Sequence, residues 1–190
     1  MKQLSTASQT VGPYFHLGLT GPRSIGSITQ AGAKGESVTL VCTVLDGDGA
    51  AVPDAMVEIW QANADGKYDH PEDTQEKAVD PACRGFGRMG TDAQGRVEFH
   101  TIRPGRVPGP DHRSQAPHLN VSLFARGLLK RLATRIYFAG DPANDEDFVL
   151  SLVPKERRDT LLAKPDPARP GWWRFEVHLQ GERETVFFDV

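Results

Sequence analysis

The stretch SVTLVCTVLDGDGAAVPDAMVEIWQA, residues 37–62, decides the fold class of this chain. Its first eight residues form a nearly continuous apolar run, which predicts a buried strand. The closing MVEIWQA carries β-branched and aromatic residues and predicts a second strand. The segment between them is rich in Gly, Asp and Pro, which favours turns. Two short strands joined by a turn-rich connection therefore begin the folded part of the chain.

Strand patterns continue along the chain on both sides of polar connections. Residues 87–105, GRMGTDAQGRVEFHTIRPG, contain two strand-like segments around a turn at Asp92 to Gly95. HLNVSLFARG and LKRLATRIYFAGD predict a further pair that turns near Gly127, and WWRFEVHLQ and ETVFFDV predict two closing strands. PKERRDTLLAK, residues 154–164, is the one segment with a helical pattern. We expect an all-β chain: a β-sandwich of mixed sheets with long loops, an extended N-terminal arm and one short helix.

The chain divides at about residue 35. Residues 1–35 carry Gly and Pro with little periodicity, which predicts an extended arm that contacts a partner subunit rather than part of the core. Residues 36–190 carry the strand patterns and predict one β-sandwich domain. A chain of 190 residues is long enough for a single substantial core.

Composition excludes several classes of protein. The formal charge of −3 comes from 22 basic and 25 acidic residues spread along the chain, so we expect no nucleic-acid partner. No apolar run approaches the ~18 residues that span a bilayer, and the start lacks a signal-like apolar region, so we expect no membrane association and a cytoplasmic protein.

Cys42 and Cys83 form neither a disulfide framework nor a CxxC metal motif. A single bridge between them stays open.

Four segments carry a resemblance to a known family. VEIWQANADGKYDH, GFGRMGTDAQGRVEFHTIRPG, APHLNVSLFARG and RLATRIYFAGD resemble, in this order, the core of the intradiol ring-cleaving dioxygenases. The match covers most of residues 36–190, and a series fixed in order and spacing is more specific than one short motif. The resemblance implies a β-sandwich fold and a chemistry based on Fe(III), which this family binds through two tyrosines and two histidines. Fe(III) is a hard cation that favours phenolate oxygen.

The resemblance also implies that this chain has lost half of the metal site. Tyr68 and His118 match the first tyrosine and the first histidine of the family. Val107 stands in place of the second tyrosine and has no donor atom, and Asn120 stands in place of the second histidine with a neutral amide. We therefore expect no metal ligand and no catalytic residue in this chain.

Some members of the family consist of two homologous chains, of which only one binds the metal, and this arrangement explains the loss of two donors. The ends SQTVGPYF and GERETVFFDV resemble the non-iron-binding alpha type of chain. The resemblance implies an αβ hetero-oligomer in which a homologous beta subunit binds Fe(III). It also implies that the assembly uses O2 to cleave protocatechuate (3,4-dihydroxybenzoate) to 3-carboxy-cis,cis-muconate in the β-ketoadipate pathway of aromatic catabolism.

Five residues are implied by the resemblance to line the substrate pocket of the partner. They are Thr10, Gly12, Pro13, Tyr14 and Arg126. An arginine suits a benzoate carboxylate because its guanidinium offers paired donors and a permanent charge. Arg131 and Arg135 compete with Arg126 for this role and rank below it.

The sequence leaves two other functions open. The first is a self-sufficient intradiol dioxygenase acting on catechol or hydroxyquinol, although such relatives carry a helical N-terminal segment that we do not expect in residues 1–35. The second is a non-catalytic β-sandwich binding or scaffold protein, because a fold does not fix a function.

Overall fold

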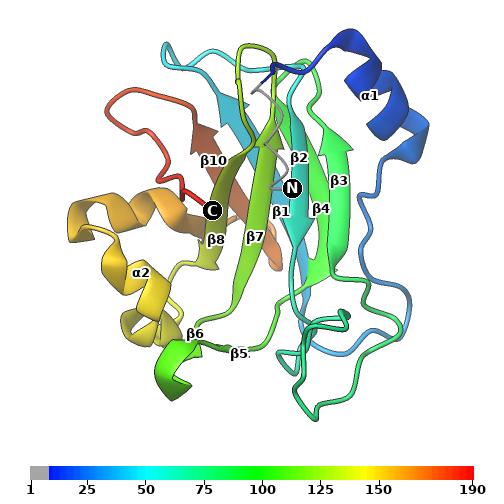
Figure 1. Cartoon of the computed structure of the whole chain (residues 1–190), viewed down its shortest axis with the longest axis vertical. Coiled ribbons are helices and arrows are strands. Elements are labelled where there is room, and N and C mark those ends of the chain that lie inside the picture. The colour runs from blue at the N-terminus through cyan, green and yellow to red at the C-terminus, as the bar shows by residue number, and fades with distance from the viewer. Residues whose placement is uncertain (1–8) are drawn as a thin grey trace, which may run out of the picture.

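The computed structural model describes residues 9–190, so the first eight residues of the predicted arm lie outside the described part. The described chain is dominated by eight strands that form one sheet in the order β3-β2-β7-β8-β9-β10-β1-β4 (Figure 1). A separate ribbon pairs β5 with β6. The strands are β1 (Ser37–Leu45), β2 (Met56–Trp60), β3 (Phe86–Gly90), β4 (Arg96–Ile102), β5 (Val107–Pro108), β6 (Ser114–Gln115), β7 (His118–Phe124), β8 (Leu132–Phe138), β9 (Leu162–Pro165) and β10 (Trp172–His178).

The long sheet folds over on itself into two facing layers, which confirms the predicted β-sandwich. One layer holds β3, β2, β7 and β8, and the other holds β10, β1 and β4. The short strand β9 joins them because it pairs with β8 on one side and with β10 on the other. The pairs β1–β10 and β8–β9 are parallel and the others are antiparallel, so the sheet is mixed as expected.

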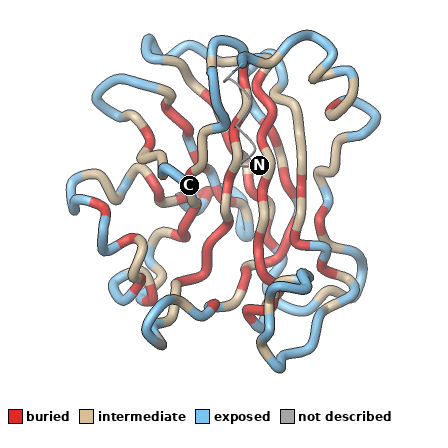
Figure 2. The backbone as a smooth tube through the Cα atoms, in the orientation of Figure 1, coloured by how far each residue is buried: buried red, intermediate tan, exposed pale blue. Residues whose placement is uncertain are grey.

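The core lies between the two layers. In β1 alternate residues are buried, and Leu40, Cys42 and Val44 are fully shielded from solvent. They meet buried apolar residues of the opposite layer such as Leu119 and Ile136 in one hydrophobic cluster. Figure 2 shows the buried backbone concentrated in the strands, with exposed backbone in the loops. Cys42 is free in this core, as is Cys83 elsewhere, so the two do not form a disulfide.

Helices are short and differ from the single helix expected. They are α1 (Pro13–Leu19), α2 (Phe148–Leu152) and the 3₁₀ helices Gly21–Arg23, Pro110–His112, Pro142–Glu146 and Lys155–Leu161. The predicted helix at 154–164 is the last of these, and it is 3₁₀ rather than α. It ends at Leu161 because the next residues are drawn into β9. No helix of residues 9–190 is long and apolar enough to cross a membrane.

The predicted arm is neither fully extended nor wholly separate from the core. Pro13 opens α1, in the first helical turn where proline costs no hydrogen bond. Further along, Ile25 bridges to Arg88 of β3 and Ser27 bridges to His100 of β4. Ile28, directly after these contacts, is 1% exposed and belongs to the main core cluster. The expectation of an arm without a helix and outside the core is therefore wrong for these residues.

The C-terminal segment ETVFFDV does not form the predicted strand. It makes one isolated bridge, in which the Phe188 N–H donates to the Ala133 carbonyl at 2.8 Å. Side-chain hydrogen bonds replace a regular ladder: the Thr134 hydroxyl donates to the Val186 carbonyl at 2.7 Å, and the His178 N–H donates to the Thr185 hydroxyl at 3.0 Å. The apolar residues Val186, Phe187 and Phe188 are only partly buried, and the predicted strand pairing is wrong for this segment.

Candidate functional site

The four positions of the family metal site meet in one pocket of about 420 Å³. His118 and Asn120 lie on the same side of β7 because side chains two residues apart in a strand point to the same face. Val107 comes from β5, and Tyr68 comes from the loop after β2. This pocket, called here the lapsed pocket, is lined by Trp60, Tyr68, His70, Glu72, Asp73, Thr74, Gln75, Val107, Pro108, Gln115, His118, Asn120 and Arg135.

A glycine lets the loop that carries Tyr68 approach the segment before Val107. Gly66 has a φ of +77°, which favours glycine, and a Cβ atom there would collide with the carbonyl oxygen of Arg106. The Asn63 side chain holds the same loop by accepting hydrogen bonds from the N–H groups of Asp65 and Lys67. The pocket therefore depends on the ADGKY turn seen in the sequence.

Tyr68 is held as a neutral phenol. Its ring stacks on Trp60 with ring centroids 5.9 Å apart and planes 8° from parallel. The Asn120 amide donates a hydrogen bond to the Tyr68 hydroxyl at 3.3 Å. Burial raises the pKa of Tyr68 and outweighs the opposing effects of Asn120 and the Arg135 charge. The phenolate that Fe(III) prefers is therefore disfavoured here.

His118 is buried and uncharged. The residue is only 3% exposed. In its neutral tautomer the ring donates a hydrogen bond from Nδ1 to the Ala116 carbonyl oxygen at 2.8 Å. Burial first, and then the positive charge of Arg135, lower the pKa of His118 to about 4, although Ala116 and Asp147 act in the opposite direction. At neutral pH this histidine is a hydrogen-bonded core residue.

The donor set of the lapsed pocket does not fit Fe(III). Tyr68 and His118 are the two side chains at these positions that could coordinate it, Val107 has no donor, and Asn120 uses its amide on Tyr68. Within residues 9–190 there is no group of three or more His, Cys, Asp or Glu side chains placed to hold a metal ion. The four positions therefore offer two donors where the family uses four.

The depressed pKa of His118 predicts a specific acid sensitivity. The neutral form is favoured by folding, so stability is fully present above the unfolded pKa of ~6.5 and is lost as the pH falls toward 4. The loss at the acid end is on the order of 3 kcal/mol. Urea unfolding of the chain and of His118→Gln at steps between pH 7 and 4 should show a weaker pH dependence in the variant. The same pH dependence of the unfolding free energy in both proteins would contradict this prediction.

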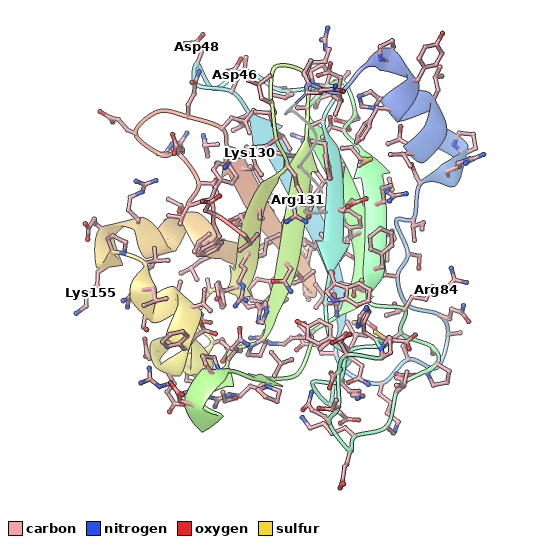
Figure 3. All side chains as sticks on the ribbon, in the orientation of Figure 1. Asp46, Asp48, Arg84, Lys130, Arg131 and Lys155 are labelled. Carbon is pink, nitrogen blue, oxygen red and sulfur yellow. The ribbon has the colours of Figure 1, made fainter. Side chains whose placement is uncertain are left out.

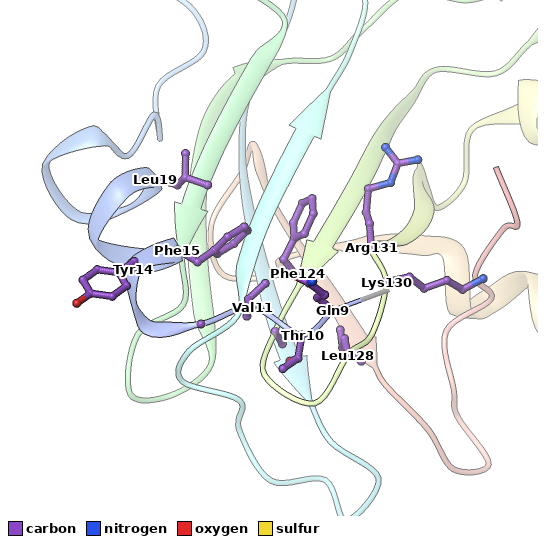
Figure 4. Close-up of a pocket in the computed structure, with 12 residues that line it drawn as sticks. Gln9, Thr10, Val11, Tyr14, Phe15, Leu19, Phe124, Leu128, Lys130 and Arg131 are labelled. Carbon is purple, nitrogen blue, oxygen red and sulfur yellow. The ribbon is translucent and has the colours of Figure 1, made fainter. Parts of the chain in front are cut away.

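A second pocket, of about 620 Å³, lies beside the N-terminal segment and is called here the arm pocket (Figure 4). Thr10, Gly12 and Tyr14, which the resemblance places at the substrate pocket of a partner subunit, line this pocket of their own chain. The Gly127 N–H donates to the Thr10 hydroxyl at 2.9 Å, which ties the arm to the β7–β8 turn. The Phe15 ring packs against the Phe124 ring at the end of β7, with centroids 5.4 Å apart. These two contacts hold the arm against the end of β7 and the turn that follows it.

The other two candidates lie near the arm pocket without lining it. Pro13 is the first residue of α1. Arg126 is 76% exposed at its side chain, and its guanidinium forms an ion pair with Asp54. The cations that do line the pocket are Lys130 and Arg131, just before β8 (Figures 3 and 4). Lys130 is a lining cation that was not among the candidates drawn from the sequence.

The two pockets lie at opposite ends of β7. His118 opens this strand at the lapsed pocket, and Phe124 closes it at the arm pocket. At ~3.3 Å per residue, these positions are about 20 Å apart. Arg135 lines the lapsed pocket, whereas Arg131 lines the arm pocket and Arg126 lines neither. Thr10 and Tyr14 therefore cannot act on a ligand bound in the lapsed pocket of the same chain.

Known proteins match both the sequence and the fold. The profile of the family described as Dioxygenase matches residues 11–181. The chain is 45% identical to the protocatechuate 3,4-dioxygenase alpha chain of Burkholderia cepacia, over 97% of both chains. It is 37% identical to the beta chain of that enzyme in the same organism, over 80% of this chain and 67% of the other. The dioxygenase domain of a carbohydrate-binding fusion protein from Streptomyces sp. SirexAA-E matches with a TM-score of 0.63 and 27% identity, over 92% of this chain and 97% of that one. The chain therefore belongs to the dioxygenase family, whose intradiol ring-cleaving members its motifs resemble.

Proposed function

We propose that this chain is the alpha chain of a protocatechuate 3,4-dioxygenase. It pairs with a homologous beta chain that binds Fe(III), and the assembly uses O2 to cleave protocatechuate between its two hydroxylated carbons, giving 3-carboxy-cis,cis-muconate. The likeness to an alpha chain over nearly the whole length supports this function. The observation that carries it is the lapsed pocket, which collects all four family positions but keeps only Tyr68 and His118 as donors.

The work of this chain in the assembly is positioning rather than chemistry. Fe(III) on the beta chain supplies the Lewis acidity that activates the catechol. The arm, with Thr10, Gly12, Pro13 and Tyr14, closes the wall of that site, excludes water and limits the poses of the substrate. The arm suits this role because Tyr14 is 82% exposed and the arm pocket lies about 20 Å from the lapsed pocket of its own chain.

Co-expression with the iron-bearing chain tests the proposal. We expect a stable complex that contains one iron per αβ pair, shows the visible tyrosinate-to-iron absorption, and consumes O2 with protocatechuate. The chain expressed alone should contain no iron and show no turnover. Iron and activity in the chain alone would instead favour a self-sufficient enzyme for catechol or hydroxyquinol. A chain that binds no beta partner would favour a scaffold protein.

Arg126 is proposed to bind the substrate carboxylate across the interface. We expect Arg126→Ala in the complex to raise the KM for protocatechuate by about 10-fold or more, because a charge-assisted hydrogen bond is lost, while the iron content stays unchanged. Folding should hardly change, since an exposed ion pair such as Arg126–Asp54 contributes little stability.

Asp54→Ala is the matched control for Arg126→Ala. It removes the same ion pair and leaves the guanidinium free, so the KM for protocatechuate should stay close to that of the parent complex. Steady-state O2 uptake over a range of protocatechuate concentrations measures both variants. An unchanged KM in Arg126→Ala would remove Arg126 from the substrate site.

A further inference from the structure

The lapsed pocket contains a cation that no carboxylate neutralises directly. Arg135 projects from β8 into this pocket and is partly buried. Its Nη1 donates to the Gln115 side-chain oxygen at 2.6 Å and lies 3.4 Å from the Tyr137 hydroxyl. Both partners are neutral, and among residues 9–190 no acidic side chain lies within ion-pair distance of Arg135. A guanidinium held in this way keeps an unmet preference for an anion.

The remaining donors of Arg135 are suited to a carboxylate. Both of its hydrogen bonds to described residues use Nη1, so Nε and Nη2 are left without protein partners in the described chain. These two N–H groups form the parallel pair that a carboxylate accepts in a bidentate bond. Both atoms keep contact with solvent, and Arg135 lines the lapsed pocket.

The buried acidic side chains around the pocket already form hydrogen bonds or ion pairs with groups other than Arg135. Asp73 forms an ion pair with Lys67 at 3.2 Å. Burial would raise the pKa of Asp73, but hydrogen bonds from Tyr68, Gln75 and Lys67 outweigh burial and hold it at about 2. Asp147 is fully buried, and its oxygens accept hydrogen bonds from the N–H groups of Ala116 and Leu150 at 2.7 Å and from the Tyr137 hydroxyl at 3.1 Å. Glu72, the other lining acid, is exposed.

The rest of the wall is suited to a flat ring. Trp60 and Tyr68 form a parallel stack, and His70 meets Trp60 edge-on with centroids 6.3 Å apart. Val107 adds an apolar side chain where a metal-binding tyrosine would stand. His118 is neutral and spends Nδ1 on Ala116, so it adds no second positive charge. About 420 Å³ is ample space for a molecule with one aromatic ring.

We propose that the lapsed pocket is a metal-free binding site for a small aromatic carboxylate, with Arg135 pairing with its carboxylate and the aromatic wall of Trp60 and Tyr68 contacting its ring. The site is formed by residues of this chain alone, so we expect it to bind its ligand without a beta chain. In this view the loss of two metal donors converted the pocket from a metal site into an anion site.

Titration of the full-length, iron-free chain with benzoate tests the site. Calorimetry measures the affinity, and the fluorescence of Trp60, followed in a Trp172→Phe/Trp173→Phe background, locates the ligand. We expect saturable binding of one benzoate, at least about 10-fold weaker binding of acetate, which lacks the ring, and no saturable binding of phenol, which lacks the charge.

Two variants remove the anion preference by different routes. Arg135→Gln deletes the charge, and Gln115→Glu keeps Arg135 but gives it an internal carboxylate 2.6 Å from Nη1 with almost no change in shape. Both should weaken benzoate binding by about 10- to 100-fold. The control is Arg131→Gln, which removes one charge four residues earlier, beside the arm pocket, and should bind like the parent.

Several outcomes would overturn the site. They are a parent chain that does not bind benzoate, a Gln115→Glu chain that binds it as tightly as the parent, and an equal loss of affinity in Arg131→Gln. Acetate binding as tight as benzoate binding would remove the aromatic part of the assignment. Thermal unfolding of each variant checks that the comparison is made between folded proteins, and Gln115→Glu decides the question if Arg135→Gln does not fold.

Discussion

Val107→Tyr combined with Asn120→His is expected to make this chain bind Fe(III) by itself. The two substitutions add a phenol and an imidazole at positions that already share one pocket with Tyr68 and His118. The Asn120 replacement also removes the amide that donates to the Tyr68 hydroxyl, which frees that oxygen for coordination. Four donors of the kinds that Fe(III) favours would then converge where two stand now.

Iron content should rise from near zero to about one ion per chain in the double variant. The chain should also gain a visible tyrosinate-to-iron absorption band. Either substitution alone leaves three donors and should give weak, chelator-sensitive binding. Val107→Phe with Asn120→His is the matched control, because it fills the pocket equally but lacks the phenol oxygen. A double variant without iron after reconstitution would show that sharing a pocket does not place these positions in coordination geometry.

Tyr14→Ser combined with Leu17→Ser is expected to weaken the complex with the beta chain. Both side chains project from α1, and they are 82% and 75% exposed although they are large and apolar. Burying such a side chain contributes roughly 1.5–3 kcal/mol. Loss of both contacts should therefore raise the dissociation constant by about 100-fold or more.

Leu152→Ser provides the control for this interface. Leu152 is a comparably exposed leucine, at 68%, but it lies on α2, on the other side of the molecule from α1 (Figure 1). Its replacement should leave the complex intact. Sedimentation of dilution series of each complex gives the dissociation constants. Equal affinity in the parent and in the α1 double variant would exclude the arm as a major contact.

The strands were predictable because the burial of a strand leaves a local pattern of apolar residues in the sequence. The apolar run of residues 38–44 predicted β1 without any knowledge of the neighbouring strands, and the structure shows that Leu40, Cys42 and Val44 form its buried face. Ile28 could not be assigned to the core in the same way, because it stands in a Gly- and Pro-containing segment without periodicity. Its burial follows from bridges to β3 and β4, which are distant in sequence. The same limit applies to the C-terminal segment, whose apolar residues are held by side-chain hydrogen bonds instead of a ladder.

Sequence by itself determined the number of metal donors, since the identities of Tyr68, Val107, His118 and Asn120 are local facts that no folding can change. Only the tertiary structure decided which side chains meet: it brought those four positions into one pocket, placed Arg135 there with them, and left Arg126 paired with Asp54 near the arm pocket. The three arginines 126, 131 and 135 look alike in sequence because each is a cation near a predicted strand. Strand pairing and chain turns, which join residues far apart in the chain, gave them different surroundings and therefore different chemistry.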